Sequence, residues 1–297
     1  MDLYSTKISD GLYKSLRSLP VPSIAAIETI DNINLIILLL AYYSYNDHLK
    51  TYPLNSLIMA RDTVGNNIYG PAAAVGNIGL IKYLSGNKEL DIDNVNNNKN
   101  TPFLIASAYG QIDVLKYLIK SNRVNIHHLG IEGRNAILFA AYFGQLETIK
   151  FLESNGVSYN ILTDLGRNVF FIACEIGDLN MVKYFENKKD IDLNLFDTTG
   201  MTPYLFAAAK GHIDILSHLR NNNRINLKIT DKQYNSNAFI WAASGEHIEA
   251  MDIVSYPTST QTLISIIDLY KIQDMQIQKN SSKLKKWMDD SQLFIKV

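Results

Sequence analysis

A segment that recurs through the middle of the sequence restricts the fold more than any other feature. Two copies align at sight, TPFLIASAYGQIDVLKYL from Thr101 and TPYLFAAAKGHIDILSHL from Thr202. Further copies begin at Asn67, Asn135, Asn168 and Asn237, and the last of them reads as one residue shorter near its glycine. One glycine per copy aligns, with separations of 34, 34, 33, 34 and 34 residues, at Gly76, Gly110, Gly144, Gly177, Gly211 and Gly245. A period of this length is typical of repeat proteins, in which each unit buries its apolar face against its neighbours.

Each copy predicts a helix, a tight turn and a second helix. Thr101 and Thr202 can cap a helix whose first residue is the following proline, which has no amide hydrogen to lose there. The aligned glycine is expected to end this helix in the left-handed conformation. The second helix follows from apolar residues at helical spacing, as in Ile112, Leu115, Leu118 and Ile119. A projecting β-turn is predicted before the unit, at Asp62-x-x-Gly65 and Asp197-x-x-Gly200.

This pattern resembles the ankyrin-repeat family, whose unit of about 33 residues carries a T-P-L-H-x-A signature. The resemblance is strongest over DTTGMTPYLFAAAKGHIDIL, residues 197–216, and extends over roughly residues 61–254. It implies an all-α solenoid of stacked helix-turn-helix units with β-turn fingers. One departure is consistent, since the family's histidine is replaced in every copy, by Gly70, Leu104, Leu138, Phe171, Leu205 and Ile240. We expect apolar packing to take over from the hydrogen bonds of that histidine.

The two ends differ from the middle and are expected to cap the stack, because a terminal unit must cover an otherwise exposed apolar face. Residues 1–60 are predicted to form a helical cap or a diverged repeat, with a helix over residues 34–43. Residues 255–297 are predicted to form a second helical cap and a tail, with an amphipathic helix over residues 259–276. The lysine-rich SSKLKKW segment and the final LFIKV suggest, as an alternative, a docking or secretion tail. The sequence therefore predicts three parts, with about six repeats between the ends.

Composition excludes several classes of protein. A formal net charge of -1 over 297 residues lacks the positive field that phosphate-backbone binding needs, so a nucleic-acid partner is not expected. The longest apolar run, residues 35–41, is far below the roughly 18 residues that cross a bilayer, and the first residues show no secretory signal pattern. A single cysteine excludes a disulfide framework and fits a reducing compartment. These features predict a cytoplasmic protein without membrane insertion.

Residue patterns for catalysis and metal binding are scarce. Cys174 falls among small residues of a first helix, where we expect it to pack against the neighbouring helix. His127 and His128 are adjacent, and no third ligand follows at metal-site spacing. The common phosphate-loop, zinc-protease and serine-hydrolase signatures do not occur. We therefore predict a chain that is not an enzyme and needs no cofactor or metal. The alternatives are a small enzyme with its activity in the flanks, or a ubiquitin-ligase-type substrate adaptor that uses LPVP and the helix after it.

A candidate binding surface follows from the family resemblance. Proteins that this chain resembles recognise partners through variable positions at the turn tips and just before the aligned glycine. Aromatic and arginine side chains in these positions matter most, because they dominate binding hot spots. Inward-tilted rings that fill space between first helices are the alternative interpretation. The candidate partner-binding residues are Tyr109, Glu132, Arg134, Tyr142, Phe143, Arg167, Glu175, Ile176, Met201 and Lys210.

The expected function is that of a monomeric scaffold that binds another protein on its concave face. Frequent asparagine, isoleucine, lysine and tyrosine indicate an AT-rich genome, which many intracellular bacteria and large DNA viruses possess. Ankyrin proteins from such sources often bind host factors inside a host cell. The resemblance therefore implies, as a further hypothesis, a secreted effector that acts in a host cytoplasm.

Overall fold

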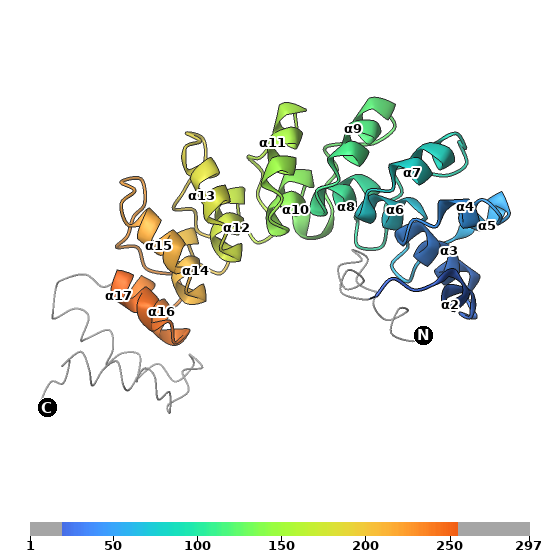
Figure 1. Cartoon of the computed structure of the whole chain (residues 1–297). Coiled ribbons are helices and arrows are strands. Elements are labelled where there is room, and N and C mark those ends of the chain that lie inside the picture. The colour runs from blue at the N-terminus through green and yellow to red at the C-terminus, as the bar shows by residue number, and fades with distance from the viewer. Residues whose placement is uncertain (1–19, 255–297) are drawn as a thin grey trace, which may run out of the picture. The chain divides into compact units, whose positions relative to one another are not determined.

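The computed structural model describes residues 20–254, and the chain divides into two compact units. Unit 1 extends to Ile161 and unit 2 begins at Leu162. Over residues 20–254 the structure consists of helices and turns without any β-strand (Figure 1). No helix in this range is both long enough and apolar enough to cross a membrane. The helix predicted over residues 259–276 and the tail after it lie outside the described residues.

Unit 1 contains three regular helix pairs. The first helices contact one another in succession, α6 against α8 and α8 against α10, while the second helix α7 contacts α9 (Figure 1). Small side chains allow this close approach, since Ala72, Ala106 and Ala140 are completely buried. The pairs are α6 (Tyr69–Val75) with α7 (Ile78–Ser85), α8 (Pro102–Ala108) with α9 (Ile112–Ser121), and α10 (Ala136–Tyr142) with α11 (Leu146–Ser154). The short 3-10 helix η2 (Ile131–Gly133) precedes α10.

The N-terminal helices of unit 1 pack on one another, and one of them contacts α6. They are α2 (Ile24–Glu28), α3 (Ile33–Tyr42), α4 (Asn46–Leu49) and α5 (Leu54–Met59). The helix predicted over residues 34–43 is confirmed as α3, which packs on α6. After it, Ser44 has a left-handed φ of 61° and its amide donates to Ala41 O at 3.3 Å. Gly76 makes the matching bond to Ala73 O at 3.4 Å, so Ser44 has the main-chain bond that the aligned glycine makes in a repeat.

Unit 2 contains three more pairs with the same contacts. First helix α12 packs on α14 and α14 on α16, and second helix α13 contacts α15, which contacts α17. The pairs are α12 (Val169–Ile176) with α13 (Leu179–Glu186), α14 (Pro203–Lys210) with α15 (Ile213–Leu219), and α16 (Ala238–Ser244) with α17 (Ile248–Val254).

The predicted left-handed glycine is confirmed in five repeats and is wrong in the sixth. Positive φ angles occur at Gly76, Gly110, Gly144, Gly177 and Gly211. In the sixth repeat Gly245 has φ −86°, and Glu246 takes the left-handed conformation with φ 58°. His247 then follows Glu246 as His212 follows Gly211, and the two histidines bond to equivalent carbonyls, those of Ala209 and Glu175. The sixth copy has therefore lost no residue, and Glu246 stands where the other copies have glycine.

The predicted turns form fingers before the first helices. In the best-matching copy, the carboxylate of Asp197 accepts bonds from the amides of Thr199 at 2.9 Å and Met201 at 3.0 Å. The amide of Gly200 donates to Asp197 O at 3.0 Å and closes the turn. Neighbouring fingers are joined by a main-chain bond, from Thr198 N to Leu165 O at 2.9 Å in unit 2. The β-turn prediction is confirmed.

Asparagine side chains take over part of the role of the missing histidine. The amide oxygen of Asn168 accepts from Phe171 N at 2.8 Å and so caps α12, while its nitrogen donates to Asp192 O at 2.8 Å. Asn135 and Asn67 donate in the same way to Ser158 O and Asp91 O, both at 2.6 Å. Leu138 and Phe171, which stand at the place of the histidine, are completely buried, so in these copies the asparagine hydrogen bonds add to apolar packing at that position.

Candidate functional site

Side chains from two repeats of unit 1 meet at the C-terminal end of α10. Tyr142 is the last residue of α10 and Phe143 is its C-cap. The guanidinium carbon of Arg134, from the preceding finger, lies 3.9 Å from the centre of the Tyr142 ring. Tyr109, the C-cap of α8, packs edge-on against Phe143 with ring centres 5.5 Å apart. We call Tyr109, Arg134, Tyr142 and Phe143 the α10 cluster.

Burial separates the α10 cluster into a supporting and an exposed part. Tyr109 is only 5% exposed, so its ring fills space behind Phe143, as the alternative interpretation of inward rings expects. Tyr142 and Phe143 are half-buried and keep part of their surface toward solvent. A half-buried ring held by a buried neighbour loses little conformational freedom when a partner covers it. The surface that remains for a partner consists of Tyr142, Phe143 and Arg134.

The finger that carries Arg134 also carries Glu132, and the two side chains form an ion pair. Glu132 has a left-handed φ of 58° and its side chain is 45% exposed, whereas that of Arg134 is 17% exposed. Exposed ion pairs contribute little to folding, about 0 to 1 kcal/mol. The ion pair here helps to position the guanidinium, because the carboxylate of Glu132 holds it near the Tyr142 ring.

Arg167 occupies the corresponding finger position in unit 2, but the structure buries it. Its guanidinium carbon lies 4.8 Å from the centre of the Phe171 ring and 4.7 Å from that of the Phe206 ring, and the two rings pack edge-on against each other. It pairs with Asp197 at 2.8 Å and with Glu175 at 2.9 Å. Its place at a turn tip predicts a surface residue, but this prediction is wrong, because these contacts leave its side chain only 9% exposed. Arg167 is thus positioned to join α12, α14 and the next finger, and little of it can contact a partner.

The remaining predicted residues of unit 2 differ in exposure. Met201 is 6% exposed and bonded through its main chain to Asp197, so it too offers little to a partner. Glu175 and Ile176 are half-buried at the end of α12. Lys210 is exposed, with its ammonium group 5.7 Å from the centre of the Phe206 ring. Phe206 was missed, since no spacing rule distinguishes it from the apolar residues beside it in α14.

Comparison with known proteins identifies the repeat. A family model described as ankyrin repeats in three copies matches residues 70–163 and 139–231, which together exceed half of the chain. This chain belongs to the ankyrin-repeat family. Among solved structures, one chain from a complex of a predatory endopeptidase of Bdellovibrio bacteriovorus with an immunity protein is similar, with 21% identity and a TM-score of 0.55. The match covers 67% of the present chain and 100% of the other, and at this identity it shows the fold alone. No curated protein matches.

The residues considered for catalysis and metal binding have structural surroundings in this ankyrin fold. Cys174 is completely buried, and burial raises the pKa of its thiol above the usual value, which disfavours the nucleophilic thiolate. The ring nitrogen Nε2 of His128 lies 2.8 Å from Lys99 O and can donate a hydrogen bond to it. Over residues 20–254, no group of three or more His, Cys, Asp or Glu side chains is placed to hold a metal ion.

Proposed function

We propose that this ankyrin-repeat chain is a non-enzymatic scaffold that binds another protein through the exposed part of the α10 cluster. The observation that carries the proposal is the stack of Arg134 on the half-buried ring of Tyr142, with Phe143 beside it. Such pairs combine large contact area with a charged, hydrogen-bonding rim, which is the composition of binding hot spots. The known ankyrin repeats of the chain support the broader role, since repeat stacks offer extended surfaces to partners.

The proposed contact includes the finger as well as the helix end. Glu132 and Arg134 project from the turn that precedes α10, and Tyr142 ends the same helix. A partner that covers the ring therefore also meets a carboxylate and a guanidinium in fixed positions. In unit 2 we propose Glu175, Ile176 and Lys210 as a separate contact region with the same placement in the repeat.

A cross-linking pull-down with mass spectrometry tests the proposal. The bait is the full chain, compared with a Tyr142→Ala/Phe143→Ala variant and a control Glu147→Ala/Lys150→Ala variant. The control removes an exposed ion pair from α11, the second helix of the same repeat. We expect the wild type and the control to recover one common partner, and the aromatic variant to lose it by at least about tenfold.

Thermal unfolding of the same three proteins separates binding from folding. Retention of the partner by a folded aromatic variant would contradict the proposal. A loss of several kcal/mol in stability would instead assign the rings to the core. In that case the Arg134→Lys variant tests the proposal, because lysine keeps the charge but cannot stack as a planar group on Tyr142. A partner that binds the lysine variant as well as the wild type would end the proposal.

The adaptor alternative loses support from the position of α3. A docking box on this helix needs side chains that reach a ligase component, yet residues 36–42 of α3 are buried. At the end of the LPVP segment, Pro22 O accepts a hydrogen bond from the hydroxyl of Tyr45 at 2.8 Å.

We further propose that the chain acts as a monomer in a cytoplasm, and as a secreted effector in that of a host cell. The AT-rich composition and the occurrence of ankyrin proteins among effectors support this role. Light scattering of the purified chain measures its mass, and the mass of one chain is expected.

A reporter fused to the chain, with and without the last twenty or so residues, tests delivery into host cells. Delivery is expected only with those residues. No delivery by either fusion would count against an effector.

A further inference from the structure

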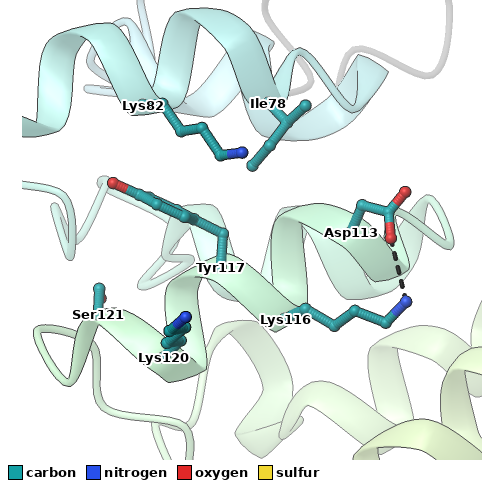
Figure 2. A pocket seen from close by; sticks show the side chains of 7 residues that line it. All are labelled: Ile78, Lys82, Asp113, Lys116, Tyr117, Lys120 and Ser121. Carbon is teal, nitrogen blue, oxygen red and sulfur yellow. Dashed lines mark hydrogen bonds and ion pairs between the residues drawn. The ribbon is translucent and has the colours of Figure 1, made fainter.

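A groove runs between the second helices α7 and α9 of unit 1, away from the first-helix residues of the α10 cluster. Its volume is about 670 Å³. Ile78 and Lys82 line it from α7, and Asp113, Lys116, Tyr117 and Lys120 line it from α9 (Figure 2). Nothing in the proposed function uses these residues.

The groove carries an excess of positive charge. Asp113 is its one acidic lining residue and is paired with Lys116 at 3.1 Å. Lys82 and Lys120 are exposed, and within the described part of the chain neither has a carboxylate at ion-pair distance. Arg123 adds a further cation just beyond α9, where it donates to Ser85 O at 2.8 Å. This concentration of charge contrasts with the net charge of -1 of the whole chain.

Between the charges lies an apolar floor. The ammonium group of Lys82 is 5.9 Å from the centre of the Tyr117 ring, and Figure 2 shows Ile78 on the same helix as Lys82. The hydroxyl of Tyr117 bonds to the hydroxyl of Ser85, which fixes the ring. An aliphatic or aromatic side chain can therefore rest on Ile78 and Tyr117 while acidic groups beside it meet the lysines.

The corresponding place in unit 2 shows that the fold does not require this charge. Between α13 and α15, Ser217 and Asn221 stand where α9 has Lys116 and Lys120. Glu186, at the end of α13, adds a carboxylate there and pairs with His218 at 2.8 Å, so this place carries less positive charge than the groove of unit 1. Lys183 keeps the place of Lys82, so the same helix pair is built without the two lysines of α9, and the fold does not need the excess of positive charge found in unit 1.

We propose that the α7–α9 groove docks an acidic segment of a partner protein, with an apolar side chain of that segment seated on Tyr117. Complementary charge provides the attraction, because clustered lysines raise the local concentration of carboxylates. A peptide fits the groove better than a nucleic acid does. A peptide can supply an apolar side chain beside its carboxylates, whereas the apolar floor has no counterpart in a sugar-phosphate backbone.

Fluorescence anisotropy with the full chain tests this docking site. The probe is a short labelled peptide of alternating Glu and Leu, and the reference is the same peptide with Gln in place of Glu. The test variant is Lys82→Gln/Lys120→Asn, which introduces at one position the residue that unit 2 carries. The control is Lys88→Gln/Lys150→Gln, which removes the same charge from unit 1 outside the groove. We expect the test variant to weaken Glu/Leu binding roughly tenfold, the control to leave it within about twofold, and Asp113→Asn to strengthen it.

Each outcome bears on the proposal. Equal weakening by the test and control variants would mean that general charge attracts the peptide, and would overturn it. Absence of Glu/Leu binding, equal binding of the Gln peptide, or a preference for single-stranded DNA or anionic vesicles would also overturn it. Because Tyr142→Ala leaves this groove intact, retained Glu/Leu binding in that variant distinguishes the groove from the α10 surface.

Discussion

At the scale of single residues, the asparagines that precede the first helices each perform two tasks. Asn168 caps α12 through its oxygen and holds the loop before the next finger through its nitrogen. Thr101 and Thr202 cap their helices in the same place but offer no amide to donate. The repeats therefore differ in how firmly the loop after the second helix is held.

Replacement of Asn168 separates the two tasks. Asn168→Thr retains a capping oxygen and loses the bond to Asp192 O, so we expect a loss of about 1 kcal/mol in the free energy of unfolding. Asn168→Ala loses the capping oxygen as well as this bond, and we expect its free energy of unfolding to fall by about 2 kcal/mol. Urea unfolding measures the two values. An alanine variant no less stable than the threonine variant would contradict the double role.

Two glycines with left-handed backbones allow the cost of backbone strain to be measured apart from the cost of steric crowding. Gly177 has φ +80°, and an added Cβ would lie 2.8 Å from the His212 ring of the next repeat, whereas Gly156 has φ +84° with nothing near. Gly156→Ala is expected to cost about 1 kcal/mol for the backbone alone. Gly177→Ala should cost clearly more, since it also displaces His212 from its bond to Glu175 O. Equal melting temperatures of the two variants would show that His212 moves aside without loss.

Asp93 makes stability depend on pH. Burial raises the pKa of its carboxyl above the usual value, although the amide of Asn125 donates to it at 2.9 Å. Because the pKa of Asp93 is higher in the folded state, folding favours the protonated carboxyl. The stability that this carboxyl contributes is fully present below its pKa in the unfolded chain and is lost as the pH rises through its pKa in the folded chain. In unit 2 the equivalent residue is Asn194, whose uncharged side chain accepts the same hydrogen bond from Asn226 N at 2.7 Å.

Asp93→Asn is therefore expected to be more stable than the wild type at neutral pH. The difference in melting temperature should grow as the pH is raised from about 4, the range in which an ordinary aspartate ionises. Denaturation followed across this range measures it. A variant that is less stable than the wild type at neutral pH would show that the charge of Asp93 helps folding.

At the scale of elements, Arg167 links α12, α14 and the finger between them. Its partner Asp197 has a completely buried side chain, so removal of the guanidinium would leave a carboxylate with little solvent. Loss of one partner of a buried pair costs about 3 to 5 kcal/mol. We expect this loss for Arg167→Met, against less than about 0.5 kcal/mol for Lys210→Met, an exposed lysine over the same Phe206 ring. Calorimetry that finds equal effects would contradict a structural role for Arg167.

The elements were predictable from the sequence where a local rule determines them. Thr101 and Thr202 cap their helices, the turn glycine has positive φ in five repeats, and α3 lies where the apolar run places it. Glu246 was missed because glutamate rarely adopts a positive φ and a glycine stands beside it. The sequence predicts an exposed Arg167, because a charged residue at a turn tip usually is exposed, and only the tertiary contacts with Asp197 and Phe206 bury it.

The candidate site was predictable only in part, for the same reason. The repeat period brings Tyr109, Tyr142 and Phe143 to equivalent places in adjacent repeats, and the structure joins them in one cluster. The direction of each ring depends on its neighbours, so the sequence could not tell that Tyr109 points inward. The groove between α7 and α9 was not predicted, since exposed lysines are usual on the solvated face of a helix.

At the scale of the whole molecule, each unit contributes stability through contacts between neighbouring repeats. In such stacks the stability is close to a sum of repeat and nearest-neighbour terms. Arg167→Met should therefore speed amide exchange in α12 and α14 and leave α8 unchanged. Exchange that rises equally in all three helices would show that the repeats unfold as one cooperative body.

The central claim is that a partner protein covers the end of α10 and the finger before it. Hydrogen–deuterium exchange of the full chain, alone and with the partner captured by the wild type, tests this claim most directly. We predict slower exchange over residues 131–145, and no such slowing when the Tyr142→Ala/Phe143→Ala variant is mixed with the same partner. Slowing confined to the second helices, with residues 131–145 unchanged, would contradict it.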